Sequence, residues 1–216
     1  ILFNIDIEGP ITKDKTAVLR VFAKMFYNHL GFYGENLKVA MLEHYIAQCG
    51  KTEEFRRIFE EKKGKPWVET RRAFAFNGKA VVPALMEALD MSEEDARAWF
   101  QDKAPIELSI AQLVRDMKEY VDGRPEGFRL LFMIDEVGQY VGTDTDMLLN
   151  LQSLAEKIGS ECGGKIWVMC TGQEAIDEII KVRADEFSRI QARFRTRLSL
   201  SSSSVDEVIQ KRVLKK

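Results

Sequence analysis

The stretch that decides the expected fold reads Leu130-Leu131-Phe132-Met133-Ile134-Asp135-Glu136. An unbroken apolar run that ends in acids is typical of a central strand in a parallel sheet, which is covered on both faces. A second run of this kind reads Ile166-Trp167-Val168-Met169-Cys170. Further strands are expected at residues 1–7 and, shorter, at residues 197–200. The pattern predicts an α/β fold built on a parallel sheet.

A helix is expected between the two apolar runs. Polar residues at 143–146 offer capping side chains for its start, and apolar residues then recur at helical spacing: Leu148, Leu151, Ala155 and Ile158. Strand, helix and strand together form a βαβ crossover, which is right-handed almost without exception. Asp135 and Thr171 should therefore lie at the same edge of the sheet, where ligands bind in open α/β folds.

The segment from residue 13 to residue 127 reads mainly as helices separated by turns. The expected helices lie near residues 15–29, 37–48, 53–62, 81–89, 93–102 and 108–121. We interpret this segment as a large helical insertion between two strands of one sheet. The predicted organisation is a core strand and loop at 1–12, the insertion at 13–127, the main part of the core at 128–204, and the start of a further helix or lid at 205–216.

Composition favours a globular protein of the cytoplasm. The chain has 216 residues, of which 45% are hydrophobic and 31% charged, and a formal net charge of −2. Such a charge gives no argument for nucleic acid or an acidic membrane as partner. Three scattered cysteines and two histidines offer no zinc site of the usual spacing. No apolar run approaches the roughly 18 residues that a membrane helix needs.

The acids at the end of the first apolar run match the Walker B motif of P-loop ATPases. Mg²⁺ prefers hard oxygen ligands and keeps several waters, so one carboxylate on a rigid strand end is enough to hold it beside phosphates. Asp135 is therefore the candidate metal ligand. Glu136 is the candidate general base that polarises an attacking water. The alternative is that both acids merely end a buried strand where it meets solvent.

Two further segments carry candidate catalytic residues. At the end of the next strand, Thr171 or Gln173 is expected to contact the γ-phosphate or the lytic water, as in ATPases of the AAA+ kind; the alternative is an ordinary loop and helix start. Arg193, within an arginine-rich stretch, is the candidate to reach a neighbouring subunit's nucleotide, because a guanidinium suits phosphate charge. The alternative there is a solvated basic face or a nucleic-acid contact.

Residues 9–16, Gly-Pro-Ile-Thr-Lys-Asp-Lys-Thr, resemble a phosphate-binding loop in which Asp14 replaces the second glycine. A carboxylate at that position would repel phosphates, and Pro10 lacks the N–H that such a loop needs. We interpret Lys13 and Asp14 as the start of an exposed helix instead.

Several long stretches resemble one known family, the P-loop ATPase of bacteriophage-exclusion (BREX) defence systems, called BrxC or PglY. They are Phe3-Asn4-Ile5-Asp6, Asp135-Glu136-Val137-Gly138-Gln139-Tyr140-Val141-Gly142-Thr143-Asp144-Thr145, Leu149-Asn150-Leu151-Gln152, and Gln191-Ala192-Arg193-Phe194-Arg195-Thr196-Arg197-Leu198-Ser199-Leu200-Ser201-Ser202. The resemblance runs from end to end of the chain.

The resemblance implies an AAA+-like core that uses ATP and Mg²⁺, with Asp135 and Glu136 as its Walker B acids. It implies a phosphate loop upstream of the strand at residues 1–6, so the chain is expected to be a fragment of a larger protein. It also implies work with other BREX proteins, including a DNA methyltransferase. A homo-oligomer, a scaffold without hydrolysis and an initiator-like ATPase that binds DNA stay open as alternatives.

Overall fold

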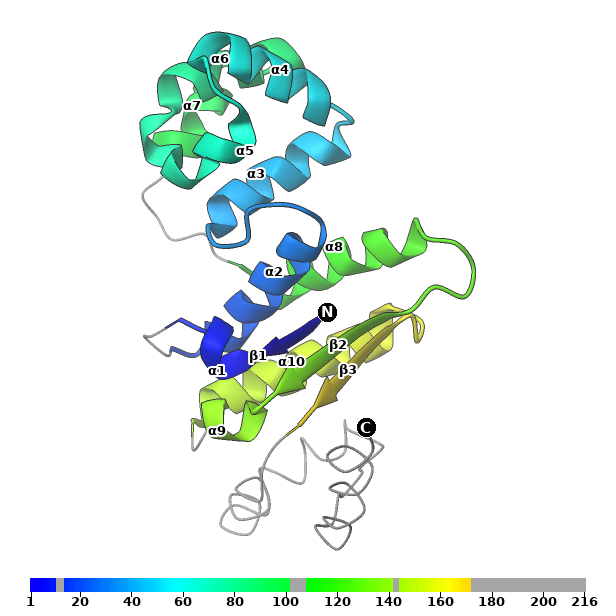
Figure 1. Cartoon of the computed structure of the whole chain (residues 1–216). Coiled ribbons are helices and arrows are strands. Elements are labelled where there is room, and N and C mark those ends of the chain that lie inside the picture. The colour runs from blue at the N-terminus through cyan, green and yellow to red at the C-terminus, as the bar shows by residue number, and fades with distance from the viewer. Residues whose placement is uncertain (11–13, 102–107, 142–143, 172–216) are drawn as a thin grey trace, which may run out of the picture.

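The structure is a computed structural model that describes residues 1–10, 14–101, 108–141 and 144–171 (Figure 1). Within these residues it is a mixed α/β fold, mostly helical, with a parallel sheet of three strands in the order β1-β2-β3. The strands are β1 (Leu2–Asn4), β2 (Leu130–Asp135) and β3 (Ile166–Cys170). The predicted α/β class and the parallel pairing of the two apolar runs are therefore confirmed.

The long helices occupy the predicted places. They are α2 (Ala17–His29), α3 (Leu37–Gln48), α4 (Thr52–Lys63), α6 (Gly78–Leu89), α7 (Glu93–Gln101), α8 (Ile110–Asp122) and α10 (Thr145–Glu161). The short elements were not predicted; they are α1 (Ile5–Glu8), α5 (Trp67–Thr70), the 3-10 helix η1 (Arg71–Phe76) and α9 (Val137–Val141). None of the helices in the described part of the chain is both long and apolar enough to cross a bilayer.

The first strand is shorter than predicted. Residues 1–7 were expected to form one strand, but β1 ends at Asn4. The reason is a helix cap, because the Asn4 side chain accepts hydrogen bonds from the backbone N–H groups of Asp6, at 2.9 Å, and Ile7, at 3.2 Å. These bonds turn the chain into α1 directly at the edge of the sheet.

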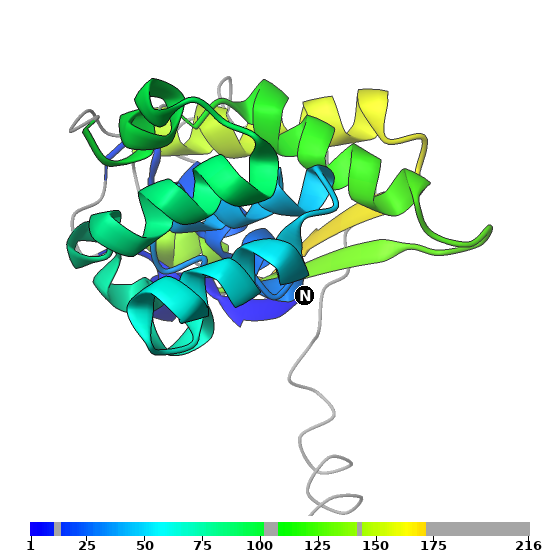
Figure 2. The same ribbon diagram turned by 90° about the horizontal axis from the view of Figure 1, so that it is seen from above.

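One face of the sheet packs against α2, α8 and α10, which lie on the same side of the strands (Figure 2). Phe132 of β2 is fully buried there, and its ring centroid lies 5.3 Å from that of Phe22 in α2. Phe3 of β1 meets the same Phe22 ring edge-on at 6.0 Å. The helix layer and the sheet therefore share one hydrophobic core.

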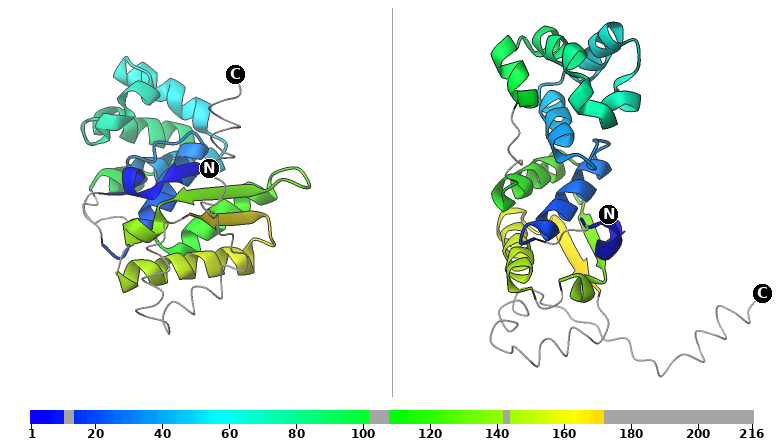
Figure 3. Two further views of the ribbon diagram at one scale, coloured as in Figure 1. Left: turned by 60° about the horizontal axis from the view of Figure 1, so that its bottom comes forward. Right: turned by 90° about the vertical axis from the view of Figure 1, so that its left-hand side faces the viewer.

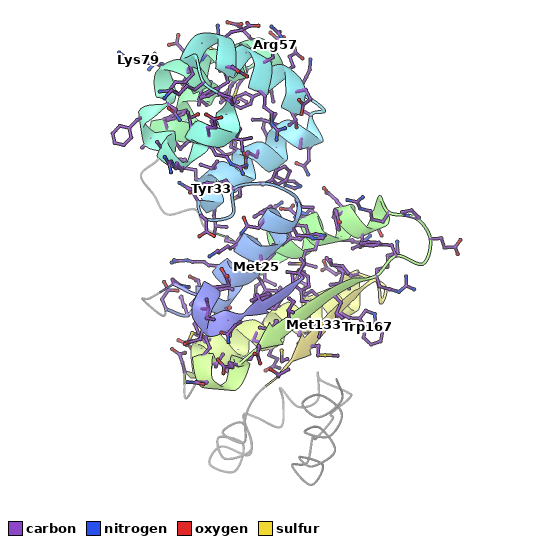
Figure 4. The ribbon with its side chains drawn as sticks, in the orientation of Figure 1. Met25, Tyr33, Arg57, Lys79, Met133 and Trp167 are labelled. Atoms are coloured by element: carbon purple, nitrogen blue, oxygen red, sulfur yellow. The ribbon has the colours of Figure 1, made fainter. Side chains whose placement is uncertain are left out.

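The other face of the sheet is exposed in the described part of the chain. The apolar side chains on it come from all three strands: Leu2, Leu131, Met133, Trp167 and Met169. Met133 is 36% exposed and Trp167 is 61% exposed, and both side chains extend from this face in Figure 4. The expectation that the strands are covered on both faces was wrong for these residues. The described helices supply only one covering layer.

A second hydrophobic core lies in a helical lobe apart from the sheet (Figure 3). Its buried residues come from α3 to α7, between Val39 and Ala96. By contrast, α2 and α8, which fall within the range expected to form the insertion, pack in the core of the sheet. The helical lobe therefore includes fewer residues than the expected insertion at 13–127.

Helix α3 joins the two cores, since Ala40 packs in the sheet's core while Val39 packs in the lobe.

The side chain of Glu43 in α3 is buried and accepts hydrogen bonds from three groups. The carboxylate accepts from Trp67 Nε1 at 2.6 Å, from the Tyr33 backbone N–H at 2.6 Å and from Arg71 at 2.8 Å. Burial of this charge is tolerated because every partner donates to it.

Substitutions at two adjacent residues of β2 test which face is covered. Phe132→Ala should lower the free energy of unfolding by about 3–5 kcal/mol, because it empties a buried site. Met133→Ala should lower it by less than about 1 kcal/mol, because that side chain faces solvent. Chemical denaturation of both variants measures the difference. Equal, large losses would show that the exposed face is packed after all.

Candidate functional site

The carboxyl edge of the sheet brings together side chains from three strand ends. Asp135 is the last residue of β2, Glu136 follows it, and Thr171 follows β3. Asn4 is the last residue of β1 and pairs in register with Asp135. Asp135 and Thr171 therefore lie at one edge, as the crossover argument predicted, and Asn4 joins them from the other side.

Thr171 is hydrogen-bonded to Asp135 and to the two residues that flank the acid pair. Its backbone N–H donates to the carbonyl of Ile134 at 2.9 Å, and its carbonyl accepts from the N–H of Val137 at 3.2 Å. Its hydroxyl Oγ1 donates to Asp135 Oδ1. The two backbone bonds bracket residues 135 and 136, so the end of β3 fixes the path of the chain through the two acids.

That path places Glu136 in an unusual backbone conformation. Its φ is 61°, in the left-handed region, which a residue with a Cβ rarely adopts. Its N–H donates to Asp135 Oδ1 at 3.0 Å. Backbone outliers of this kind cost of order 1–3 kcal/mol and gather at functional sites. The turn directs the Glu136 side chain toward β1 instead of along the strand.

Asn4 holds the Glu136 carboxylate. Its amide Nδ2 donates to Glu136 Oε2 at 2.8 Å, while its Oδ1 caps α1. One side chain thus ends β1, starts α1 and orients an acid 132 residues away. No role for Asn4 was predicted from the sequence. A polar residue at the end of a short apolar strand, next to an acid-rich turn, was the available signal.

The two short helices at this edge, α1 and α9, pack against each other. Gly9 lies so close to Tyr140 of α9 that an added Cβ would meet the phenol oxygen at 2.5 Å. Burial raises the pKa of Tyr140, and the nearby charges of Asp6 and Asp14 raise it further. The phenol therefore stays neutral at physiological pH and acts in packing.

The segment at residues 9–16 does not behave as a phosphate loop where it is described. Asp14 Oδ1 accepts from the backbone N–H of Thr16 at 2.7 Å and from its hydroxyl at 2.6 Å. The hydroxyl bond of Thr16 lowers the pKa of Asp14, and Arg20 pairs with the same carboxylate at 3.2 Å. Asp14 thus lies in the turn before α2, which begins at Ala17. The helix that follows is largely buried against the sheet, and not exposed as interpreted from the sequence. Residues 11–13 lie outside the described part.

The groups at the edge suit a divalent cation that is held by one protein carboxylate. They do not suit a cation that is enclosed by several protein ligands. Among the described residues, no three or more His, Cys, Asp and Glu side chains gather as a metal site. Asp135 is exposed, and its hydrogen bonds within the described residues use Oδ1. Among the described residues, no hydrogen bond engages Oδ2. One free carboxylate oxygen, completed by water and phosphate, is the kind of site that Mg²⁺ uses.

Two of the candidate residues, Gln173 and Arg193, lie outside the described residues, as do the expected strand at 197–200 and the segment at 205–216. The described geometry therefore brings together Asn4, Asp135, Glu136 and Thr171.

No protein-family model matches the chain, and no solved structure is significantly similar to it.

Two substitutions at Asn4 separate its capping role from its contact with Glu136. Asn4→Ala should lower the free energy of unfolding by about 1 kcal/mol, because the cap of α1 is lost. Asn4→Ser should stay close to wild type, because serine caps helices as well as asparagine does. Urea denaturation measures both. A loss that is equal in both variants would show that the cap is not what Asn4 contributes.

Proposed function

We propose that this chain is part of an AAA+-like P-loop ATPase of a bacteriophage-exclusion defence system. One observation carries the proposal: Asp135 and Glu136 leave the carboxyl end of the central strand of a parallel sheet, with the Thr171 hydroxyl bonded to the first acid. Ligands bind at this edge in open α/β folds. The resemblance in sequence, which includes both acids, supports the family.

In this proposal, Asp135 holds Mg²⁺ through Oδ2, directly or through one water. The bound metal neutralises charge on the phosphates of ATP, as in other phosphoryl-transfer sites. Asp135 suits this task because the end of β2 fixes its backbone and two hydrogen bonds occupy its other oxygen. The chain's own contribution is a carboxylate oxygen held in a constant place.

Glu136 acts as the general base in the same proposal. Asn4 anchors Oε2, so Oε1 is the oxygen left to accept a proton from the attacking water. The bond to Asn4 holds the Glu136 side chain beside β1, whereas Asp135 Oδ1 is bonded to Thr171 beside β3. Metal ligand and base thus remain separate groups, as hydrolysis by a polarised water requires.

The proposed setting follows from the family that the chain resembles. The protein would work in the cytoplasm with other BREX proteins, including a DNA methyltransferase, and couple hydrolysis of ATP to assembly or remodelling of the defence complex. The proposal retains Gln173 as a contact of the γ-phosphate or the water and Arg193 as a contact across a subunit boundary. In that family a phosphate loop precedes the strand that matches β1.

Substitution of the proposed base is the direct test. In the intact protein that contains this chain, Glu136→Gln should lower the rate of ATP hydrolysis by about 10²–10⁴-fold, because the water loses its proton acceptor. Binding of ATP should persist, since the metal ligand is intact. Steady-state phosphate release and nucleotide retention on the protein measure the two effects.

The matched control is Glu60→Gln, which makes the same chemical change on an exposed position of α4 in the helical lobe. It should leave hydrolysis at the wild-type rate. Full activity of the Glu136 variant would mean that this acid is not the base. The 216 residues alone should hydrolyse ATP negligibly, and turnover by them that Glu136→Gln abolishes would contradict that expectation.

A scaffold role is the second candidate, and the separate core of the helical lobe favours it. The lobe carries two strongly exposed apolar side chains, Val68 and Phe76, on adjoining short helices. Loss of phage defence in a Val68→Ser, Phe76→Ser double variant whose ATP hydrolysis stays normal would support binding of a partner there.

A further inference from the structure

We propose that Thr171 is a positioning residue for the metal ligand: its hydroxyl sets the orientation of the Asp135 carboxylate and leaves Oδ2 as the oxygen that meets the cation. The catalytic meaning of this assignment rests on the proposed ATPase function. The contact itself does not, because it can be measured without nucleotide. From the sequence, Thr171 was expected instead to contact the γ-phosphate or the lytic water.

The hydroxyl is the part of Thr171 that acts on Asp135. The two backbone bonds, to the carbonyl of Ile134 and from the N–H of Val137, do not depend on the side chain. They fix the route of the main chain at residues 135 and 136. The third bond, from Oγ1 to Asp135 Oδ1, fixes a side chain that is otherwise exposed to solvent.

The bond decides which carboxylate oxygen is available. Asp135 Oδ1 accepts two hydrogen bonds, one from Thr171 and one from the N–H of Glu136 at 3.0 Å. An exposed aspartate without these bonds would rotate and offer either oxygen. Holding the carboxylate in one rotamer removes an entropic cost from metal binding. Oδ2 is then presented in a constant direction at the edge of the sheet.

The same bond conflicts with direct contact between Thr171 and phosphate. A threonine hydroxyl has a single proton to donate. While that proton is shared with Asp135, the hydroxyl cannot donate it to a phosphate oxygen. Thr171 would therefore act through Asp135. It would change the affinity for the metal more than it would change the binding of the phosphate.

The first test needs only the 216-residue chain. Three-bond NMR couplings to the Thr171 methyl carbon should report a single rotamer, and Asp135→Ala should make it average over several, because its acceptor is gone. Asp146→Ala, an exposed acid in the first turn of α10, is the control and should change nothing. A Thr171 rotamer that is unaffected by Asp135→Ala would overturn the proposal.

The second test uses the intact protein and separates metal from nucleotide. Thr171→Val should raise the Mg²⁺ concentration for half-maximal hydrolysis by roughly tenfold, the scale of one hydrogen bond to a charged group. Excess Mg²⁺ should restore most of the rate, and Thr171→Ser should behave like wild type. A lower rate at saturating Mg²⁺ with unchanged metal dependence would instead assign Thr171 to the phosphate and overturn the proposal.

The two tests fail in different ways. If the intact protein hydrolyses no ATP, the proposed function is wrong, while the NMR couplings still decide whether the Thr171 hydroxyl is bonded to Asp135. If hydrolysis depends on Glu136 but the metal dependence ignores Thr171, the ATPase stands and the positioning role falls. The melting temperature of the Thr171→Val variant shows whether it is folded. If it is not, the Thr171→Ser variant still tests the role of the hydroxyl, which it keeps.

Discussion

The parallel register of β2 and β3 is the constraint on which the rest of the structure depends. It pairs Ile134 with Cys170, so the next residue of each strand, Asp135 and Thr171, meets at the carboxyl edge. The bond from the Thr171 N–H to the Ile134 carbonyl closes the ladder at that point. A shift of one residue would turn Asp135 toward the helix layer and expose Ile134, at a large cost in buried apolar area. Burial of one face of the sheet therefore fixes the strand register, and the register places Asp135 and Thr171 together at the edge.

The strands and helices that show a local sequence pattern were predicted correctly. The packing of the layers, and so which face of the sheet is exposed, was not. Apolar runs and crossover length were enough for β2, β3 and α10. They could not show that Met133 and Trp167 face solvent, because an unbroken apolar run looks the same whether one face or both are covered. The left-handed turn at Glu136 lies between two backbone bonds to Thr171, and the role of Asn4 depends on a contact between residues 132 positions apart. A local sequence pattern contains neither.

Helix α2 connects the edge of the sheet to the helical lobe. It begins beside Asp14, whose carboxylate binds Thr16, and ends near α3. Tyr27, near its end, donates a hydrogen bond of 2.7 Å to buried Asp116 of α8, and His44 of α3 lies 3.6 Å from the same carboxylate. These polar groups join three helices where the two cores meet. These bonds tie the lobe to the helices that cover the sheet.

The central claim is that the edge formed by Asn4, Asp135, Glu136 and Thr171 meets the metal of a bound nucleotide. The most direct measurement is an experimental structure of the intact protein with Mg²⁺ and a non-hydrolysable ATP analogue. The account predicts that the cation contacts Asp135 Oδ2, either directly at about 2.1 Å or through one water. A cation and triphosphate held elsewhere, with Asp135 facing only solvent, would contradict it.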